Sequence, residues 1–145
     1  MPTLVTDTGF LFSLYGDDAH TQRARKWLAD SSSPISISVF NRYDFQNAVR
    51  FAAFRRLITK NEALASIDAF ESDIKSGHLQ FVVIDLSTVV AEASNISASY
   101  TVSGGHRSFD IIHVAFARVL KAATFLSFDE NQRGLAKNVR IVVGP

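Results

Sequence analysis

The sequence predicts an α/β fold in which helices flank a mainly parallel sheet. Short apolar segments typical of buried strands alternate along the chain with longer segments of helical periodicity. The chain has 145 residues, 47% of them hydrophobic, and shows no repeat, low-complexity tract or obvious linker. This length suffices for one well-packed core, so we expect a single domain covering residues 1–145.

The first expected elements are a strand and two helical segments. Residues 3–7 should form a short buried strand, followed by a turn at Thr8-Gly9 and an apolar helical turn or two over residues 10–15. Asp18 is expected to cap the next helix, which ends near Leu28.

A second strand and a helical hairpin follow. Apolar and polar residues alternate over residues 35–38, which predicts a strand. A long helix is expected from about Val39 to Leu57. Residues 59–62 (Thr-Lys-Asn-Glu) have the pattern of a capping box, which opens a second helix that ends at Gly77. We expect these two helices to pair as a hairpin.

The second half of the chain continues the alternation. A strand over residues 79–86 should precede a helix that Ser87 caps and that ends near Tyr100. A flexible segment, residues 103–106, then leads into a further helix. The remaining expected elements are a strand ending at Asp129, a short helix near residues 130–137 and a last strand over residues 139–143.

Composition excludes several classes of protein. No apolar run reaches the roughly 18 residues that a membrane span needs, so no membrane association is expected. The amino terminus has no basic start, and Thr6 and Asp7 interrupt its apolar run, which is unlike a signal peptide. The absence of cysteine excludes disulfides and thiolate metal sites, and it favours a cytoplasmic protein.

The helix expected from Arg107 to Ala117 is unusual. It is apolar almost all round, as is typical of a helix in the middle of a domain, yet Asp110 lies in its first turn. A buried carboxylate is costly unless a cation, a set of donors or a metal compensates it. Asp110 is therefore a candidate functional residue.

Three other acids are placed to meet Asp110. Asp7 and Asp129 each end an expected strand, and Asp44 lies about one turn into the helix after the second strand. Because ligands of open parallel sheets bind outside the carboxyl ends of the strands, we expect the four acids to converge at one edge.

Four clustered carboxylates require a cation, because their charges repel one another. A hard divalent ion such as Mg²⁺ or Mn²⁺ prefers oxygen ligands, and one or two such ions can activate water and steady a phosphate. The chemistry indicated is phosphodiester hydrolysis. Outside these acids the chain carries an excess of positive charge, which suits an anionic partner.

At this point the chain resembles the PIN-domain ribonucleases, whose small members include the VapC-like toxins of toxin–antitoxin pairs. The resemblance covers essentially the whole chain and rests on the order and spacing of four segments. These segments are residues 4–11, 38–48, 107–115 and 126–132.

The resemblance implies roles for individual residues. Asp7, Asp110 and Asp129 take the three aspartate positions of the family. Asp44 stands where the family usually has glutamate, so it is shorter by one methylene and would reach a metal only through water. The family's hydroxyl positions, here expected to bind substrate, are taken by Thr8, beside the first acid, and Ser127, two residues before the last.

The resemblance also implies a fold and an activity. The fold would be a PIN-like three-layer α/β/α domain with a protruding helical hairpin. The activity would be an endoribonuclease that needs Mg²⁺ or Mn²⁺ and acts on RNA, with an antitoxin protein that blocks the site and a homodimer as the expected assembly.

Each acid also has an ordinary structural interpretation. Asp7 can cap the turn after the first strand, and Asp110 can be a first-turn acid favoured by the helix dipole. Asp129 fits a helix start, and Asp44 a solvated helix surface. His113, one turn after Asp110, is either a core histidine with satisfied partners or a residue facing the site.

Arg107 and several basic and apolar residues of the hairpin also have two possible roles. Arg107 either contacts substrate phosphate or pairs with an acid. Phe51, Phe54 and Leu57 recur at helical spacing, either as core or as an exposed strip for a second subunit or an antitoxin helix. The basic residues near them grip RNA backbone or form a solvated face; they are Arg50, Arg55, Arg56 and Lys60.

Two other functions compete with the nuclease. A catalytically weak or inactive PIN fold that binds RNA or a protein would explain Asp44 in place of glutamate. A phosphatase with Asp7 as covalent nucleophile needs a second aspartate two residues on, and Gly9 stands there.

Overall fold

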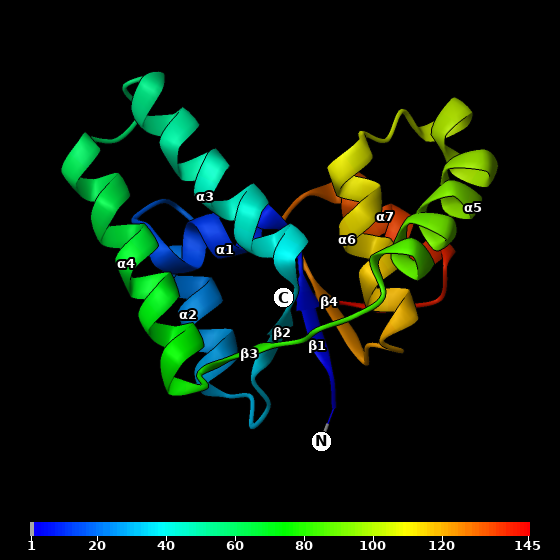
Figure 1. The fold of residues 1–145 in the computed structure, drawn as a ribbon, viewed down its shortest axis with the longest axis horizontal. Coiled ribbons are helices and arrows are strands. Elements are labelled where there is room, and N and C mark those ends of the chain that lie inside the picture. Colours follow the sequence, from blue (N-terminus) through cyan, green and yellow to red (C-terminus); the bar gives the residue numbers. More distant parts are fainter. Residues whose placement is uncertain (1) are drawn as a thin grey trace.

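Five parallel strands form the centre of the molecule (Figure 1). The computed structural model describes residues 2–145. The strands lie in the order β3-β2-β1-β4-β5, so the first strand of the chain is in the middle. Their bounds are β1 Leu4–Thr6, β2 Ile35–Ile37, β3 Leu79–Phe81, β4 Thr124–Leu126 and β5 Val142–Gly144.

Helices cover both faces of this sheet. Figure 1 shows α1 to α4 on one side of the strands and α5 to α7 on the other. The bounds are α1 Thr8–Tyr15, α2 Thr21–Ala29, α3 Val39–Phe54, α4 Lys60–Ser76, α5 Leu86–Gly104, α6 Ser108–Val119 and α7 Glu130–Asn138. The expected three-layer α/β/α arrangement is therefore confirmed, as is the hairpin of α3 and α4.

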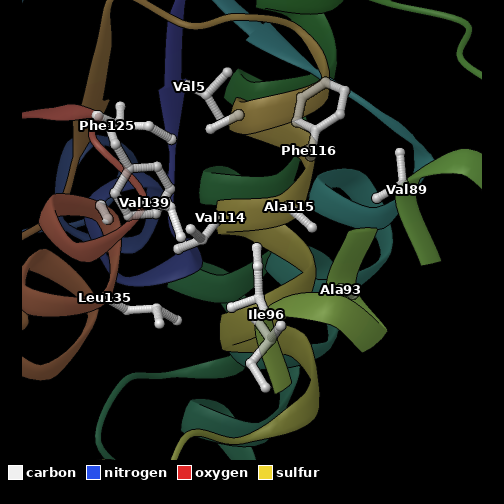
Figure 2. Packing of buried hydrophobic residues seen from close by; sticks show 14 residues of the cluster. Val5, Val89, Ala93, Ile96, Val114, Ala115, Phe116, Phe125, Leu135 and Val139 are labelled. Carbon is white, nitrogen blue, oxygen red and sulfur yellow. The ribbon is translucent and has the colours of Figure 1, made fainter. Parts of the chain in front are cut away.

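The two-residue period of the strands divides the core between the two faces. Leu4 and Leu126 pack among α1 to α4, whereas their neighbours Val5 and Phe125 pack among α5 to α7. Figure 2 shows Val5 and Phe125 gathered with Val114 of α6 and with side chains of α5 and α7. The helix expected to be central, α6, is buried along most of its length.

Local capping signals fix the ends of the hairpin helices. The Thr59 side chain accepts from the Glu62 amide and the Glu62 carboxylate accepts from the Thr59 amide, both at 3.0 Å, as the capping box predicted. Gly77 ends α4 with a positive φ of 83°, a conformation that favours glycine. Ser38 and Asn41 form a second capping box at the start of α3.

The structure corrects the amino-terminal elements. The expected turn at Thr8-Gly9 is the first turn of α1, because Asp7 caps this helix by accepting from the Phe10 amide. Asp18 does not cap α2 directly. That helix begins at Thr21, and Asp18 instead accepts a hydrogen bond from the His20 amide at 2.8 Å.

The structure also corrects the second half of the chain. Asp85, not Ser87, caps α5, because the Asp85 carboxylate accepts from the Ser87 amide at 3.1 Å. This helix continues to Gly104, through the first half of the segment expected to be flexible. The strands expected over residues 79–86, 124–129 and 139–143 are each only three residues long.

Among the described residues, no helix combines the length and the apolar character needed to cross a membrane.

Two glycine substitutions should change stability in opposite directions. Gly77→Ala places a Cβ on a left-handed backbone and should lower the free energy of unfolding by about 1 kcal/mol. Gly134→Ala, within α7, should raise it by about 0.5–1 kcal/mol, because alanine is the better helix former. At both positions an added Cβ meets nothing within 4 Å, so packing does not enter the comparison. Urea denaturation measures both, and shifts of the same sign would contradict this account.

Candidate active site

All four predicted acids line one cavity of about 830 Å³. Asp7 directly follows β1, and Asp129, which caps α7, lies three residues beyond the end of β4. Asp44 reaches the cavity from α3 and Asp110 from the first turn of α6. The fold therefore gathers carboxylates from four separated segments at the carboxyl ends of parallel strands, where ligands bind in such folds.

Asp7 is the most deeply buried of these acids, with only 4% of its surface exposed. One carboxylate oxygen accepts from the Phe10 amide at 2.7 Å, and the other accepts from the Ser127 hydroxyl. Burial raises the pKa of Asp7 to about 6, although both hydrogen bonds oppose the rise. The expected structural role as a cap holds, but the charged form of this residue is only partly compensated.

Asp44 is compensated more fully. Its Oδ2 accepts hydrogen bonds from the Thr8 hydroxyl and from His113 Nε2, the latter at 2.9 Å. Burial raises the pKa of Asp44, but the hydrogen bonds from His113 and Thr8 outweigh burial and hold it below its usual value. Thr8, predicted to contact substrate, thus also holds an acid in place.

His113 is fully buried and connects two parts of the site. Its Nδ1 lies 3.4 Å from the side-chain nitrogen of Asn41. Asn41 Oδ1 already accepts from the Ser38 amide at 2.8 Å, so the Asn41 NH₂ group faces the ring and can only donate. These contacts favour the tautomer in which Nδ1 accepts from Asn41 and Nε2 donates to Asp44. The two interpretations of His113 coincide, since it is a satisfied core residue that faces the site.

Asp110 pairs with Arg107. Arg107 Nε donates to Asp110 Oδ2 at 3.1 Å, and both residues line the cavity. Of the two alternatives for Arg107, the structure supports pairing with an acid. The guanidinium is exposed, so it also remains accessible to a ligand.

Ser127 links the two strand-end acids. Its hydroxyl donates to Asp7 and accepts from the Asp129 amide at 3.0 Å. Asp129 in turn accepts from the Gln132 amide at 2.9 Å, so the helix-start interpretation of Asp129 also holds. Gln132 lines the cavity, and its buried Oε1 accepts no hydrogen bond from any of residues 2–145.

The sequence patterns do not single out Asn41 or Gln132. Each lies at the third helical position after a capping residue, Ser38 or Asp129, which is the spacing of a capping box. This spacing would locate both residues near a helix start. It does not reveal that one faces His113 or that the other has an oxygen without a donor.

The donor set fits a hard divalent cation. Asp7 is buried with its charge partly uncompensated, and Gln132 offers an oxygen that lacks a donor. Within residues 2–145, however, no three His, Asp or Glu side chains lie close enough together to hold a metal ion.

The apolar strip of the hairpin, which consists of Phe51, Phe54 and Leu57, is exposed and is not part of the core. The exposed fractions are 55% for Phe51, 79% for Phe54 and 67% for Leu57. Phe51 and Leu57 also line the cavity, together with Arg55.

Comparison with known proteins identifies the family and the fold. A sequence model of the PIN domain matches residues 4–138. The chain belongs to the PIN domain family. The resemblance seen in the sequence and the predicted PIN fold are thus confirmed. No curated protein sequence matches the chain significantly.

Several solved structures share the PIN fold at low sequence identity. VapC20 of Mycobacterium tuberculosis, described as a Sarcin-Ricin loop cleaving toxin, has a TM-score of 0.70 and 14% identity, covering 97% of this chain and 96% of its own. VapBC2 of Rickettsia felis, bound to a DNA fragment from their promoter, has a TM-score of 0.67 and 13% identity, covering 98% and 97%. FitAcB of Neisseria gonorrhoeae has a TM-score of 0.63 and 15% identity, covering 99% and 96%.

Replacing Asp7 should stabilise the protein in the presence of a chelator. The folded-state pKa of Asp7, about 6, lies above the ordinary 3.8, so stability falls as the pH rises between these values. Asp7→Asn removes this loss. Relative to the wild type, the substitution should therefore increase the free energy of unfolding by about 3 kcal/mol more at pH 7 than at pH 4. Urea denaturation in EDTA at both pH values measures the difference.

Asp44→Asn is the matched contrast. The pKa of Asp44 is lower in the folded state than in the unfolded state. Its charge therefore stabilises the folded protein at pH values above the unfolded-state pKa, and this stabilisation is lost as the pH falls. This substitution should therefore destabilise the protein at pH 7, and less so at pH 4. The same sign for both substitutions at pH 7 would contradict the assigned environments.

Proposed function

We propose that the protein is an endoribonuclease that requires Mg²⁺ or Mn²⁺ and hydrolyses RNA phosphodiester bonds. The observation that carries the proposal is the cavity lined by Asp7, Asp44, Asp110 and Asp129 from four separate segments of a PIN fold. Such a concentration of carboxylates at a sheet edge is costly without a cation, so it favours a metal-dependent reaction over simple binding.

Asp7, Asp110 and Asp129 would hold the ion, with Asp44 contributing through water. A bound divalent ion would supply an activated water and neutralise charge on the phosphate. The chain's own residues would orient this site: Ser127 and the Phe10 amide hold Asp7, and Thr8 and His113 hold Asp44. Once Arg107 leaves Asp110, its guanidinium would be free to bind a phosphate oxygen.

An RNA substrate suits the charge around the cavity. Arg55 and Arg107 line it, and Arg50, Arg56 and Lys60 are exposed on or near the adjoining hairpin. Basic side chains of this kind bind the phosphate backbone independently of sequence. The similarity to VapC20, described as cleaving the Sarcin-Ricin loop, supports RNA over other phosphodiesters.

We further propose that the protein is the toxin of a toxin–antitoxin pair. The similarity to VapBC2, which was solved on a fragment of its own promoter, supports a cognate antitoxin that covers the site. The exposed strip of Phe51, Phe54 and Leu57 is an apolar surface suited to burial by a second protein chain. A homodimer is the expected assembly.

Three observations favour a second candidate, a weakly active or inactive PIN module that binds RNA or a protein. Asp44 Oδ2 accepts hydrogen bonds from both Thr8 and His113, Asp110 is paired with Arg107, and no three acids or histidines in residues 2–145 have metal-site spacing. A site locked in this arrangement would bind a ligand without cutting it.

Removing either of two acids should abolish cleavage while the fold survives. Asp7→Asn and Asp110→Asn each remove a proposed ligand and should lower Mg²⁺-dependent cleavage of single-stranded RNA by about a hundredfold or more. Asp68→Asn, at an exposed position on α4 away from the cavity, is the control and should cleave normally. Circular dichroism verifies folding. Wild-type rates in both site variants would refute the nuclease.

Metal uptake separates the nuclease from the inactive module. Calorimetry with Mn²⁺ should detect binding to the wild-type protein and a clear loss of affinity in Asp7→Asn, because that acid is the most buried ligand. A wild-type protein that takes up no Mn²⁺ at millimolar concentration would favour the binding module.

A further inference from the structure

A stack of three aromatic rings forms part of the cavity wall. Phe10 and Phe128 stack at 5.4 Å between ring centroids with planes 19° apart, and Phe128 and His20 stack at 4.4 Å and 11°. Phe10 is fully buried, Phe128 partly buried and His20 exposed, so burial falls along the stack. Phe128 and His20 both line the cavity that holds the acids.

Hydrogen bonds hold the loop that carries His20. The Asp18 carboxylate accepts from the Ser13 hydroxyl and from the His20 amide, each at 2.8 Å. The Thr21 hydroxyl donates to the Ser13 carbonyl at 2.6 Å and accepts from the Asp18 amide at 2.9 Å. Since Ser13 and Thr21 are buried, the backbone on both sides of His20 is anchored to α1. The ring of His20 is therefore presented in a fixed place.

The stack is joined directly to the acidic site. Phe128 lies between Ser127, which hydrogen-bonds Asp7, and Asp129. Both rings and both acids line the same cavity, so a nucleotide that occupies this cavity would have the rings of Phe128 and His20 beside it. The guanidinium of Arg23 lies 5.7 Å from the Phe128 ring centroid, which adds positive charge next to the stack.

We infer that His20, supported by Phe128, is the platform on which one unpaired base of the RNA substrate stacks. Proteins that bind single-stranded RNA commonly stack splayed bases on aromatic or histidine rings. A flat, exposed ring at the end of the stack can accept one more planar group, and the guanidinium of Arg23 favours a base that carries a phosphate. The inference rests on the proposed ribonuclease function and adds a base-binding position to it.

Binding of a fluorescently labelled, single-stranded oligoribonucleotide tests this inference. Asp110→Asn serves as the parent protein so that the strand is not cut, and fluorescence anisotropy gives the affinity. His20→Ala in this parent should weaken binding about 5- to 100-fold, the effect of losing one stacked base, whereas His20→Phe should restore binding because it keeps a flat ring. His78→Ala, at an exposed histidine outside this cavity, should bind like the parent.

Abasic oligonucleotides identify the stacked base. In a series with one abasic position each, one position should weaken binding to the parent and should have no further effect on His20→Ala, because the same contact is already lost. Two results would overturn the stacking platform while leaving the proposed RNA substrate intact. One is that the parent binds RNA and His20→Ala binds it equally well, and the other is that no abasic position shows this coupling. A parent protein that binds no oligoribonucleotide would overturn the platform and the proposed RNA substrate together.

Discussion

The parallel pairing of β1 with β4 is the constraint on which the site depends. Its register places Thr6 beside Leu126, so the next residues, Asp7 and Ser127, leave the sheet side by side and hydrogen-bond each other. Ser127 also accepts from the Asp129 amide, which links the second strand-end acid to the first. A shift of one residue in this pairing would turn each side chain to the opposite face of the sheet and separate the acids. The backbone of two three-residue strands thus determines where the negative charge gathers.

Asp7 and Asp44 lie in different electrostatic environments. Asp44, held by Thr8 and by a buried histidine whose orientation the capping box of α3 fixes, keeps its charge easily. For Asp7, burial destabilises the charged carboxylate by more than its two hydrogen bonds stabilise it. Environments that move the pKa values of neighbouring carboxylates apart are typical of functional sites. A cation near Asp7 would stabilise the charged form of this carboxylate, which is the less favourable of the two charges. This is the physical reason for the proposed metal dependence.

Much of this organisation follows from local sequence signals, and the rest depends on contacts between distant residues. The capping box at Thr59 and the glycine at Gly77 act within a few residues, so both were predictable. The cap of α5 was predicted wrongly, at Ser87 and not at Asp85, because the choice depends on how the chain leaves β3. The positions of the four acids could be predicted from strand ends and helix starts. The partners of His113 and the stack of His20 on Phe128 join residues far apart in the sequence, and no periodicity encodes them.

The measurement that tests the central claim most directly is anomalous X-ray diffraction from crystals grown with Mn²⁺. If the buried, partly uncompensated carboxylate of Asp7 acts with the neighbouring acids to hold a hard cation, an anomalous peak should lie in the cavity, bordered by Asp7 and by Asp110 or Asp129. Ordered crystals in millimolar Mn²⁺ with no peak in this cavity, or with a peak only at other residues, would contradict the account.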